Sequence, residues 1–435
     1  MEQGTGKSRV VLELIKYRLE TNKINRVLWL CPCSTKQNLR NEIIKHTGND
    51  NKDIITICGI ETLSSSIKTI EKIEEYVDNN NVFIVVDESL LVKNFFAKRT
   101  KRIIELSQKC EYRMILNGTP VSRSETDLFA QWYILDWRIL GYKSYFSFAA
   151  NHIELDKNNR FRRCLNIEYL TDKISPYTFQ VEKKECVSLP KKVYSCYSYE
   201  MTEEQTAEYY DTYERFMGII TEFSTTTVYR FFSALQSVIA GMKVTEIDNH
   251  IVTTPMFDNP YDNPRIKLLL NVLYGYDEKI IIFCKYRFEI DNIVDVLNKE
   301  YGDGSAVRFD GSISLKERNN NISKFKSNDN TKFFVSNKNC AGYGLNLQFA
   351  SKIIFYNNDF NLGTRIQAED RVHRIGQNNT VEIIDLICNK SLDTQIHRCL
   401  DKKINLLYNI IQLVNSKNEN ELKDALANIC EIEDK

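Results

Sequence analysis

Two arginines of this 435-residue chain, Arg371 and Arg374, lie three positions apart in a short polar segment between two apolar runs. Positions three apart share one face of a helix, so we expect both guanidinium groups to point the same way. A guanidinium stays charged and offers a planar fork of donors, which suits it to the charge that develops on a transferred phosphoryl group. The pair therefore predicts one half of a phosphate-transfer site.

The other half is predicted near Met1, where a glycine-rich segment precedes a run with helical apolar spacing. Glycines let backbone N–H groups curl around a phosphate, and the start of a helix favours negative charge. The ammonium of Lys7 would face the β- and γ-phosphates, and the hydroxyl of Ser8 would be a ligand of Mg²⁺. This is the second half of a Walker A loop, with Met1 where the full pattern has a glycine. The expected nucleotide-binding residues are Gly4, Thr5, Gly6, Lys7 and Ser8.

An apolar run of strand length, residues 82–86, ends in the acidic pair Asp87 and Glu88. A buried parallel strand delivers the side chains that follow it to the carboxyl edge of its sheet, where ligands gather. There Asp87 can hold Mg²⁺ through water, and Glu88 can orient the attacking water. An acidic pair is also an ordinary strand end, so the interpretation depends on its combination with the loop at residues 4–8.

Regular secondary structure must hold these groups in position. Short apolar runs alternate with amphipathic helical stretches in two blocks, as in parallel α/β sheets. Strands are expected at residues 26–30, 53–58, 82–86, 113–116, 279–284, 306–309, 332–336, 352–356 and 381–387. Between the blocks, aromatic and charged residues recur at helical spacing, which predicts a helical insertion. Its aromatic side chains are expected to form a core rather than to stack on bases.

The order of segments resembles that of superfamily 2 helicase-like ATPases, and within them the Swi/Snf-type group of double-stranded DNA translocases and chromatin remodellers. The matching segments are 2–8 (motif I), 30–34 (Ia), 87–90 (II), 116–120 (III), 280–284 (IV), 341–347 (V) and 367–377 (VI). The resemblance extends from residue 1 to about 400, in the order of the family. It implies two RecA-like doubly wound parallel-sheet domains of the P-loop NTPase class, with a helical insertion between them.

The resemblance also assigns roles. ATP and Mg²⁺ would bind between the two domains, with Lys7, Asp87, Glu88, Arg371 and Arg374 catalytic and Ser8 and Asp87 on the metal. Gly344 and Gln367 would help to sense the nucleotide. The family binds the nucleic-acid backbone, and the matching positions are Ser34, Lys36, Lys93, Arg99, Gly311, Ser312, Asn339 and Asn346. Such contacts imply little sequence specificity and a strong dependence on salt. For Lys93 and Arg99, a solvated helix surface is an equal alternative.

The chain departs from the family pattern in two places. Ser89 and Leu90 stand where the family usually has alanine and histidine, and that histidine is thought to couple the nucleotide site to motif III. The coupling can therefore differ here, while the roles of Asp87 and Glu88 are expected to persist. The chain also begins inside motif I, which a misassigned start, a truncation or a weakened nucleotide pocket would each explain. His373 is the histidine most expected to matter, although a structural hydrogen bond is the commoner role.

Composition restricts the partners. The 58 basic and 58 acidic residues cancel, so any DNA-binding surface must be local. Twelve cysteines without a CxxC pair indicate a reducing compartment and argue against zinc. The sequence has no signal peptide and no apolar stretch of about eighteen residues, which argues against secretion and membrane spanning. An intracellular location is expected, cytoplasmic in a bacterial or phage-infected cell, because the Asn, Lys and Ile content suggests AT-rich coding.

We expect a first RecA-like domain at residues 1–123, a helical insertion and linker at 124–263, a second RecA-like domain at 264–400, and a C-terminal helix and tail at 401–435. Three functions stay open. The preferred one is an ATP-driven translocase on duplex DNA, sequence-nonspecific and without strand separation. The alternatives are a true DNA or RNA helicase, and a non-hydrolysing interaction module with an incomplete nucleotide site.

Overall fold

The computed structural model describes residues 1–2, 4–118, 121, 125–155, 161–219, 225–247, 250–338, 345–360, 362–402 and 419–432. The chain divides into two compact units. Unit 1 comprises Met1–Ser188 with Gly342–Leu345, and unit 2 comprises Leu189–Ala341 with Asn346–Lys435.

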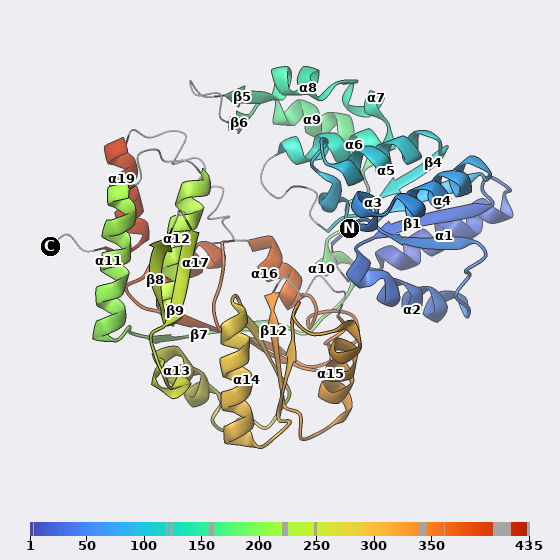
Figure 1. Cartoon of the computed structure of the whole chain (residues 1–435). Coiled ribbons are helices and arrows are strands. Elements are labelled where there is room, and N and C mark those ends of the chain that lie inside the picture. Colours follow the sequence, from blue (N-terminus) through green and yellow to red (C-terminus); the bar gives the residue numbers. More distant parts are fainter. Residues whose placement is uncertain are drawn as a thin grey trace. The chain divides into compact units, whose positions relative to one another are not determined.

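Unit 1 contains a parallel sheet with helices on both faces (Figure 1). Its elements are α1 (Lys7–Glu20), β1 (Arg26–Cys31), α2 (Lys36–Thr47), β2 (Ile55–Gly59), α3 (Thr62–Ser65), α4 (Ile67–Asp78), β3 (Val82–Val86), α5 (Lys98–Gln108) and β4 (Tyr112–Ile115). Within the described residues the strands are ordered β2, β1, β3, β4, and neighbours run parallel. One face packs against α1 and α2, and the other against α3, α4 and α5. Because both faces are covered, β1 and β3 are continuous apolar runs.

The rest of unit 1 is mainly helical. It consists of α6 (Leu128–Leu135), α7 (Trp137–Leu140), α8 (Tyr145–His152), β5 (Ile153–Leu155), β6 (Phe161–Cys164), α9 (Ile167–Ile174) and α10 (Lys183–Cys186). Phe129, Trp132, Phe148 and Leu170 are buried together here, and the rings of Phe129 and Phe148 lie 4.8 Å apart. The expectation that these aromatic side chains form a core is confirmed.

Unit 2 contains a larger parallel sheet. Its elements are β7 (Lys192–Tyr199), α11 (Glu203–Ile219), α12 (Thr225–Ile239), β8 (Met242–Ile247), β9 (His250–Pro255), α13 (Pro264–Leu273), β10 (Ile280–Cys284), α14 (Arg287–Tyr301), β11 (Ala306–Phe309), α15 (Leu315–Ser327), β12 (Phe333–Asn337), β13 (Lys352–Phe355), α16 (Leu362–Glu369), β14 (Val381–Cys388), α17 (Leu392–Asp401) and α19 (Glu419–Ile429). The order of the described strands is β11, β12, β10, β13, β14, β7. Helices α13 and α14 pack on one face, while Phe325 of α15 contacts Phe334 on the other, with 5.2 Å between the rings.

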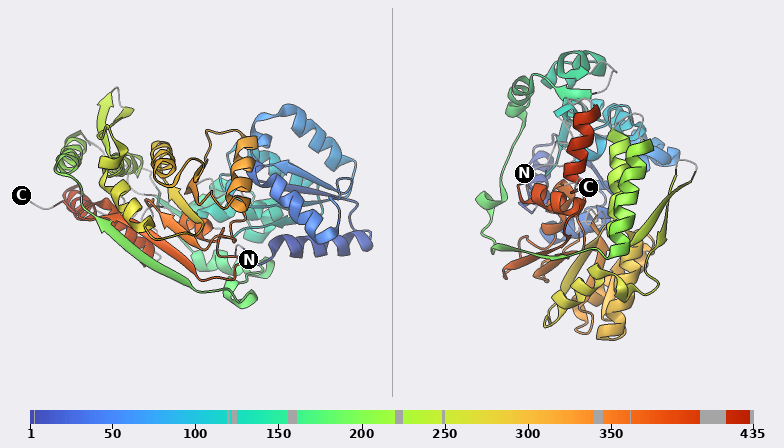
Figure 2. Two further views of the ribbon diagram at one scale, coloured as in Figure 1. Left: turned by 90° about the horizontal axis from the view of Figure 1, so that it is seen from below. Right: turned by 90° about the vertical axis from the view of Figure 1, so that its left-hand side faces the viewer.

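The structure confirms each of the expected strands to within two residues at either end. It also contains strands in the predicted helical insertion that the sequence pattern did not reveal. Strand β7 pairs with β14 along its whole length, from Val381 opposite Lys192 to Cys388 opposite Tyr199 (Figure 2). It lies at the edge of the sheet and is largely exposed, so it lacks the apolar run that marks a buried strand. The antiparallel hairpin of β8 and β9 was likewise not expected.

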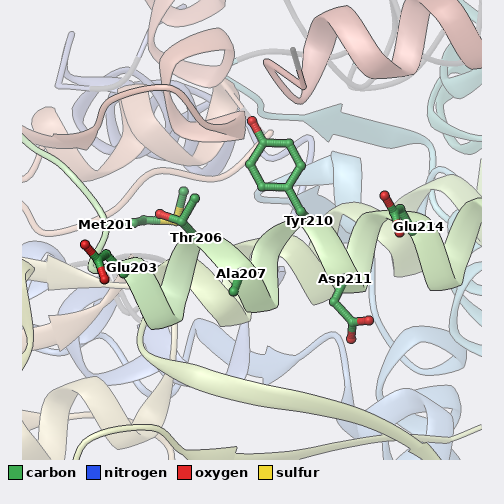
Figure 3. A pocket seen from close by; sticks show the side chains of 7 residues that line it. All are labelled: Met201, Glu203, Thr206, Ala207, Tyr210, Asp211 and Glu214. Atoms are coloured by element: carbon green, nitrogen blue, oxygen red, sulfur yellow. The ribbon is translucent and has the colours of Figure 1, made fainter. Parts of the chain in front are cut away.

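A second core of unit 2 joins α11, α12, α17 and α19. Tyr209 of α11 is fully buried there, and its hydroxyl donates to the carbonyl oxygen of Cys430, 3.0 Å away. On α11 a hollow is lined by Met201, Glu203, Thr206, Ala207, Tyr210, Asp211 and Glu214 (Figure 3). None of the expected site residues lines this hollow. The helix predicted after Leu400 falls, from residue 403 onward, outside the described residues.

Candidate functional site

Two glycines of the glycine-rich loop have left-handed backbone angles. Gly4 and Gly6 have φ angles of 78° and 87°, in the left-handed region. A side chain at Gly6 would meet nothing within 4 Å, so the backbone angle, rather than lack of space, calls for glycine there. Helix α1 begins at Lys7 without a side-chain cap on its N-terminus. The first turn of α1, which carries Lys7 and Ser8, is therefore suited to bind an anion through backbone N–H groups.

The acidic pair follows β3 directly. The backbone N–H of Asp87 donates to the carbonyl oxygen of Leu30 in the neighbouring strand at 2.8 Å, which fixes where the turn begins. Glu88 has a φ of 49°, a left-handed conformation that a residue with a side chain adopts at a cost. Its N–H donates to Oδ1 of Asp87 at 3.0 Å. Backbone strain of this kind clusters at functional sites, so the turn is a candidate for one.

The charges around Asp87 oppose one another. Protein atoms surround its carboxyl group closely, and this burial raises its pKa to about 6, helped by the negative charge of Glu88. The positive charge of Lys7 acts in the opposite direction, so the lysine and the aspartate belong to one electrostatic site. A carboxylate, a hydroxyl, an ammonium group and a helix N-terminus make a donor set that fits a nucleotide with Mg²⁺. In that set Ser8 and Asp87 would hold the metal.

In unit 1 the expected nucleic-acid residues follow the same sheet edge. Ser34 lies in the short 3₁₀ helix Cys33–Thr35 after β1, and Lys36 begins α2. Strands β1 and β3 are neighbours, with Leu30 opposite Val86, so these residues and the acidic pair follow adjacent strand ends. Lys93 is not simply solvated, because its Nζ lies 3.3 Å from Oδ2 of Asp127. Arg99 is half-buried in the first turn of α5.

In unit 2 the expectation that Arg371 and Arg374 share a helical face is wrong. Helix α16 ends at Glu369, and the chain then folds into successive turns. The N–H of His373 still donates four residues back, to Glu369 at 2.9 Å. The N–H of Arg371 donates only three residues back, to Ala368 at 3.3 Å, and that of Arg374 only two, to Val372 at 3.1 Å, so a regular helix does not continue through the segment. The turns place Val372 fully inside the core.

The pair is held close to motif V. Nη1 of Arg374 donates to Oδ1 of Asn346, so an expected catalytic residue and an expected nucleic-acid residue meet. The carbonyl oxygen of Arg371 accepts from the N–H of Leu347 at 3.1 Å. His373 donates through Nε2 to the carbonyl oxygen of Pro190 at 2.8 Å, which is the structural hydrogen bond considered for it.

Three of the other expected residues, Gln367, Gly311 and Ser312, lie in the described part of unit 2. Gln367 is half-buried on α16. Ser312 is exposed beside Gly311, accepts from Nη2 of Arg308 at 3.0 Å, and donates its N–H to Asp310 at 2.6 Å. Gly344 and Asn339 lie outside the described residues.

A buried ionic network under the arginine segment was missed. Arg365 of α16 binds Asp385 of β14 with both terminal nitrogens, and Nη2 lies 2.9 Å from Oδ2. Its Nε donates to Glu369 at 2.8 Å, and Glu369 also accepts from Lys192 of β7 at 2.8 Å. The guanidinium lies 3.5 Å from the centre of the Phe355 ring.

Two signals in the sequence could have revealed this network. A charged residue, Asp385, interrupts an apolar strand, and Arg365 and Glu369 have helical i, i+4 spacing. The network fixes α16 to the sheet, and with it the start of the arginine segment.

Among the described residues, no three His, Cys, Asp or Glu side chains group as a metal site. In the same part of the chain, no helix is both long and apolar enough to span a bilayer.

Comparison with known families and proteins gives a consistent result. The sequence matches the SNF2-related domain over residues 2–256 and the helicase conserved C-terminal domain over residues 264–376. An uncharacterized ATP-dependent helicase of Mycoplasma genitalium is 25% identical over 429 residues, which cover 93% of this chain and 39% of that protein. The homolog in Caenorhabditis elegans of SWI/SNF-related matrix-associated actin-dependent regulator of chromatin subfamily A-like protein 1 is 26% identical over 431 residues, covering 93% and 58%. The chain thus spans less than two thirds of either relative.

Among solved structures, the Sulfolobus solfataricus SWI2/SNF2 ATPase core in complex with dsDNA is 24% identical. The match covers 100% of this chain and 92% of that chain, with a TM-score of 0.45.

Proposed function

This chain belongs to the SNF2-related family of helicase-like proteins, and on that premise we propose that it is an ATP-dependent translocase on double-stranded DNA. The observation that carries the proposal is the site in unit 1. There the positive charge of Lys7, at the start of α1, acts on Asp87 of the acidic pair that follows β3. Binding of a phosphate chain and orientation of a water are the two requirements for hydrolysis of a nucleoside triphosphate.

Each residue of the site has a proposed task. Lys7 would neutralise charge on the β- and γ-phosphates, and Ser8 and Asp87 would hold Mg²⁺, which would supply further neutralisation of phosphate charge. Glu88 orients the attacking water, and its strained turn keeps the carboxylate in place. Arg371 and Arg374 of unit 2 stabilise the charge that develops on the γ-phosphate. Their proposed action on a nucleotide held by unit 1 rests on the family resemblance.

Movement along DNA is proposed to follow from cycles of closure and opening of the two units during hydrolysis. Ser34 and Lys36 support a contact with the phosphodiester backbone, because they follow the strand next to β3. Such a contact reads no sequence, and its affinity falls steeply with salt.

The proposal is tested by measuring ATP hydrolysis with duplex DNA, single-stranded DNA, RNA and no nucleic acid. Lys7→Ala serves as the control for contaminating ATPases. A translocase on duplex DNA is stimulated most by the duplex and displaces the third strand of a triplex without opening a forked duplex.

The alternatives give different outcomes. Opening of the fork would favour a helicase, and stimulation by single strands alone would contradict the duplex proposal. Absence of hydrolysis under every condition would leave a non-hydrolysing interaction module.

A further inference from the structure

The first residues of β7 contact the turns that carry the paired arginines. We call residues 370–377 the arginine segment, and a regular helix does not continue through it. Nζ of Lys192 lies 2.8 Å from Oε2 of Glu369, the last residue of α16, and 3.6 Å from Oδ1 of Asp370. The lysine therefore joins the end of the helix to the residue directly before Arg371.

A second contact lies three residues further along the segment. Nε2 of His373 donates to the carbonyl oxygen of Pro190 at 2.8 Å. Pro190 and Lys192 are among the first residues of unit 2, at the stretch by which the chain enters this unit. The two contacts bracket Arg371, and Arg374 follows the second one directly.

Strand β7 itself has a fixed place in the sheet, because it pairs with β14 along its whole length. The hydroxyl of Tyr194 donates to Oε2 of Glu369 at 3.0 Å, so a third contact comes from the same strand. We call Pro190, Lys192 and Tyr194 the β7 clasp. The clasp relates the position of the arginine segment to that of a paired strand.

Charge compensation of Glu369 alone does not account for Lys192. The carboxylate of Glu369 also accepts from Nε of Arg365 at 2.8 Å. Burial acts to raise the pKa of Glu369, but Arg365, and after it Lys192, hold this pKa below its ordinary value. What Lys192 adds is the reach to Asp370. Ion pairs between side chains as well covered as these contribute little net stability, and a defined geometry is their better-supported use.

We propose that Lys192 and His373 are positioning residues for ATP hydrolysis, which set the place of Arg371 and Arg374 through the contacts with β7. The inference rests on the proposed function, and it adds the groups that hold the two arginines ready for the charge that develops on the γ-phosphate. Lys192 and His373 act through the arginines and do not touch the nucleotide. A catalytic group displaced by about 1 Å can lose much of its effect on the rate while the nucleotide still binds.

The first test measures kcat and the Kd for ATP in the full chain with duplex DNA. Lys192→Met is expected to lower kcat about tenfold and to change the Kd by no more than about twofold, because the arginines act on charge that develops during transfer. His373→Ala should lower kcat less, about threefold, since it removes one hydrogen bond and leaves the ion pair. A loss of ATP binding equal to the loss of rate would overturn the proposal.

Lys352→Met is the matched control. Lys352 lies in β13 of the same sheet, and its Nζ is 2.6 Å from Glu382 and 3.5 Å from Glu278, so it also pairs with two carboxylates. Its side chain is 13% exposed, against 20% for Lys192. Neither partner of Lys352 lies in the arginine segment, so kcat should stay close to that of the unsubstituted chain.

The two lysine variants also control for stability. Each leaves a covered carboxylate without its lysine, so their melting temperatures should fall by similar amounts. If Lys192→Met and Lys352→Met then lower kcat equally, the role of Lys192 is merely structural and the proposal is overturned.

Conservative variants separate positioning from packing. Lys192→Arg keeps a cation whose planar fork can meet two carboxylates, and His373→Gln keeps a side-chain N–H donor. Both should recover kcat to within about threefold of that of the unsubstituted chain. If neither variant is faster than Lys192→Met and His373→Ala respectively, the contacts with β7 do not set the rate.

Hydrogen–deuterium exchange tests the positioning without hydrolysis. In the absence of nucleotide, a peptide covering residues 370–377 should exchange faster in Lys192→Met than in Lys352→Met, because its turns lose a contact with β7. A peptide covering β10, in the interior of the sheet, should exchange equally in both variants. Equal exchange of residues 370–377 in the two variants would overturn the proposal.

These measurements separate failure of this inference from failure of the proposed function. If Arg371→Ala and Arg374→Ala lower kcat but Lys192→Met does not, this inference alone fails. If the unsubstituted chain does not hydrolyse ATP, the proposed function fails, and the exchange experiment still decides whether β7 positions the arginine segment.

Discussion

Each unit has an aspartate in or directly after an interior strand of its sheet, and the pKa values of the two carboxyl groups are shifted in opposite directions. Asp87 follows β3 of unit 1, where burial raises its pKa to about 6 and the charge of Glu88 adds to the effect. Asp385 lies in β14 of unit 2, where burial also acts to raise the pKa, but Arg365 more than offsets it and holds the pKa below its ordinary value. The pKa of a closely surrounded carboxyl group is thus raised in unit 1 and lowered in unit 2.

The difference separates a candidate functional site from a structural one. Asp385 has a fixed partner in the fold, so its charge is compensated at all times and serves to hold α16 on the sheet. Asp87 lies beside a like charge and gains only part of its compensation from Lys7. Groups with unfavourable electrostatics in the folded chain are typical of sites that a ligand completes, and Mg²⁺ with a nucleotide is the ligand that we propose.

The largest expected effect comes from removing the active groups of the first site. Glu88→Gln and Lys7→Ala should each lower ATP turnover by about 10³-fold or more. Lys7→Ala removes the positive charge proposed to face the phosphates, and Glu88→Gln removes the carboxylate proposed to orient the attacking water. Steady-state hydrolysis measures this, and circular dichroism confirms the fold. Glu105→Gln makes the same chemical change as Glu88→Gln on an exposed position of α5 and should have no effect. Retained hydrolysis in Glu88→Gln would remove that residue from its role.

The second effect concerns the structural aspartate. Asp385→Asn should lower the free energy of unfolding by about 3 kcal/mol, because the buried guanidinium of Arg365 loses one of its two carboxylate partners and keeps only Glu369. Urea denaturation measures the change. The double variant Arg365→Met with Asp385→Leu should recover most of the stability, since replacing both ions removes the stranded charge. A single variant as stable as the unsubstituted chain would contradict the structural assignment.

The third effect distinguishes the arginines of unit 2 by their tasks. Arg371→Ala and Arg374→Ala should each reduce kcat about 10²-fold while the Kd for ATP changes by no more than about threefold, because the charge that they meet develops during transfer. Single-turnover hydrolysis and equilibrium binding give the two quantities. A loss of binding equal to the loss of rate would assign them to ground-state binding instead.

The smallest effect is a pH dependence of stability in unit 2. Burial opposes ionisation of Glu369 as well, but Arg365 and Lys192 together hold its pKa below the ordinary value, as Arg365 does for Asp385. A lowered carboxyl pKa contributes stability above the ordinary carboxyl pKa, near 4, and this contribution is lost as pH falls through the lowered folded-state pKa. The loss on acidification should be on the order of 1 to 2 kcal/mol. Urea denaturation at a series of pH values below the ordinary carboxyl pKa gives the free energy of unfolding. This free energy should depend less on pH in Asp385→Asn than in the unsubstituted chain, and an equal dependence would contradict the prediction.

Particular residues show which features of the structure the sequence patterns predicted and which they did not. The buried strands were predicted because side chains that face helices on both sides must be apolar at every position, as in Val82–Val86. The acidic pair was predicted because it follows such a strand. Strand β7 was not predicted, because an exposed edge strand has no such requirement and Lys192–Tyr199 mixes polar and aromatic residues. The spacing of Arg371 and Arg374 was misread, because a helix was assumed to continue past Glu369.

The sequence by itself determined the order of the motifs, the parallel sheets and the residue types that we propose for phosphate and Mg²⁺, because local spacing and apolar runs encode these features. Only the tertiary structure decided which charges are compensated. Asp87 and Asp385 have the same side chain, and what separates them is the charge beside each: the carboxylate of Glu88 beside Asp87, and the guanidinium of Arg365, brought close by folding, beside Asp385. Electrostatic energy depends on distance in space and on burial, and neither follows from position along the chain.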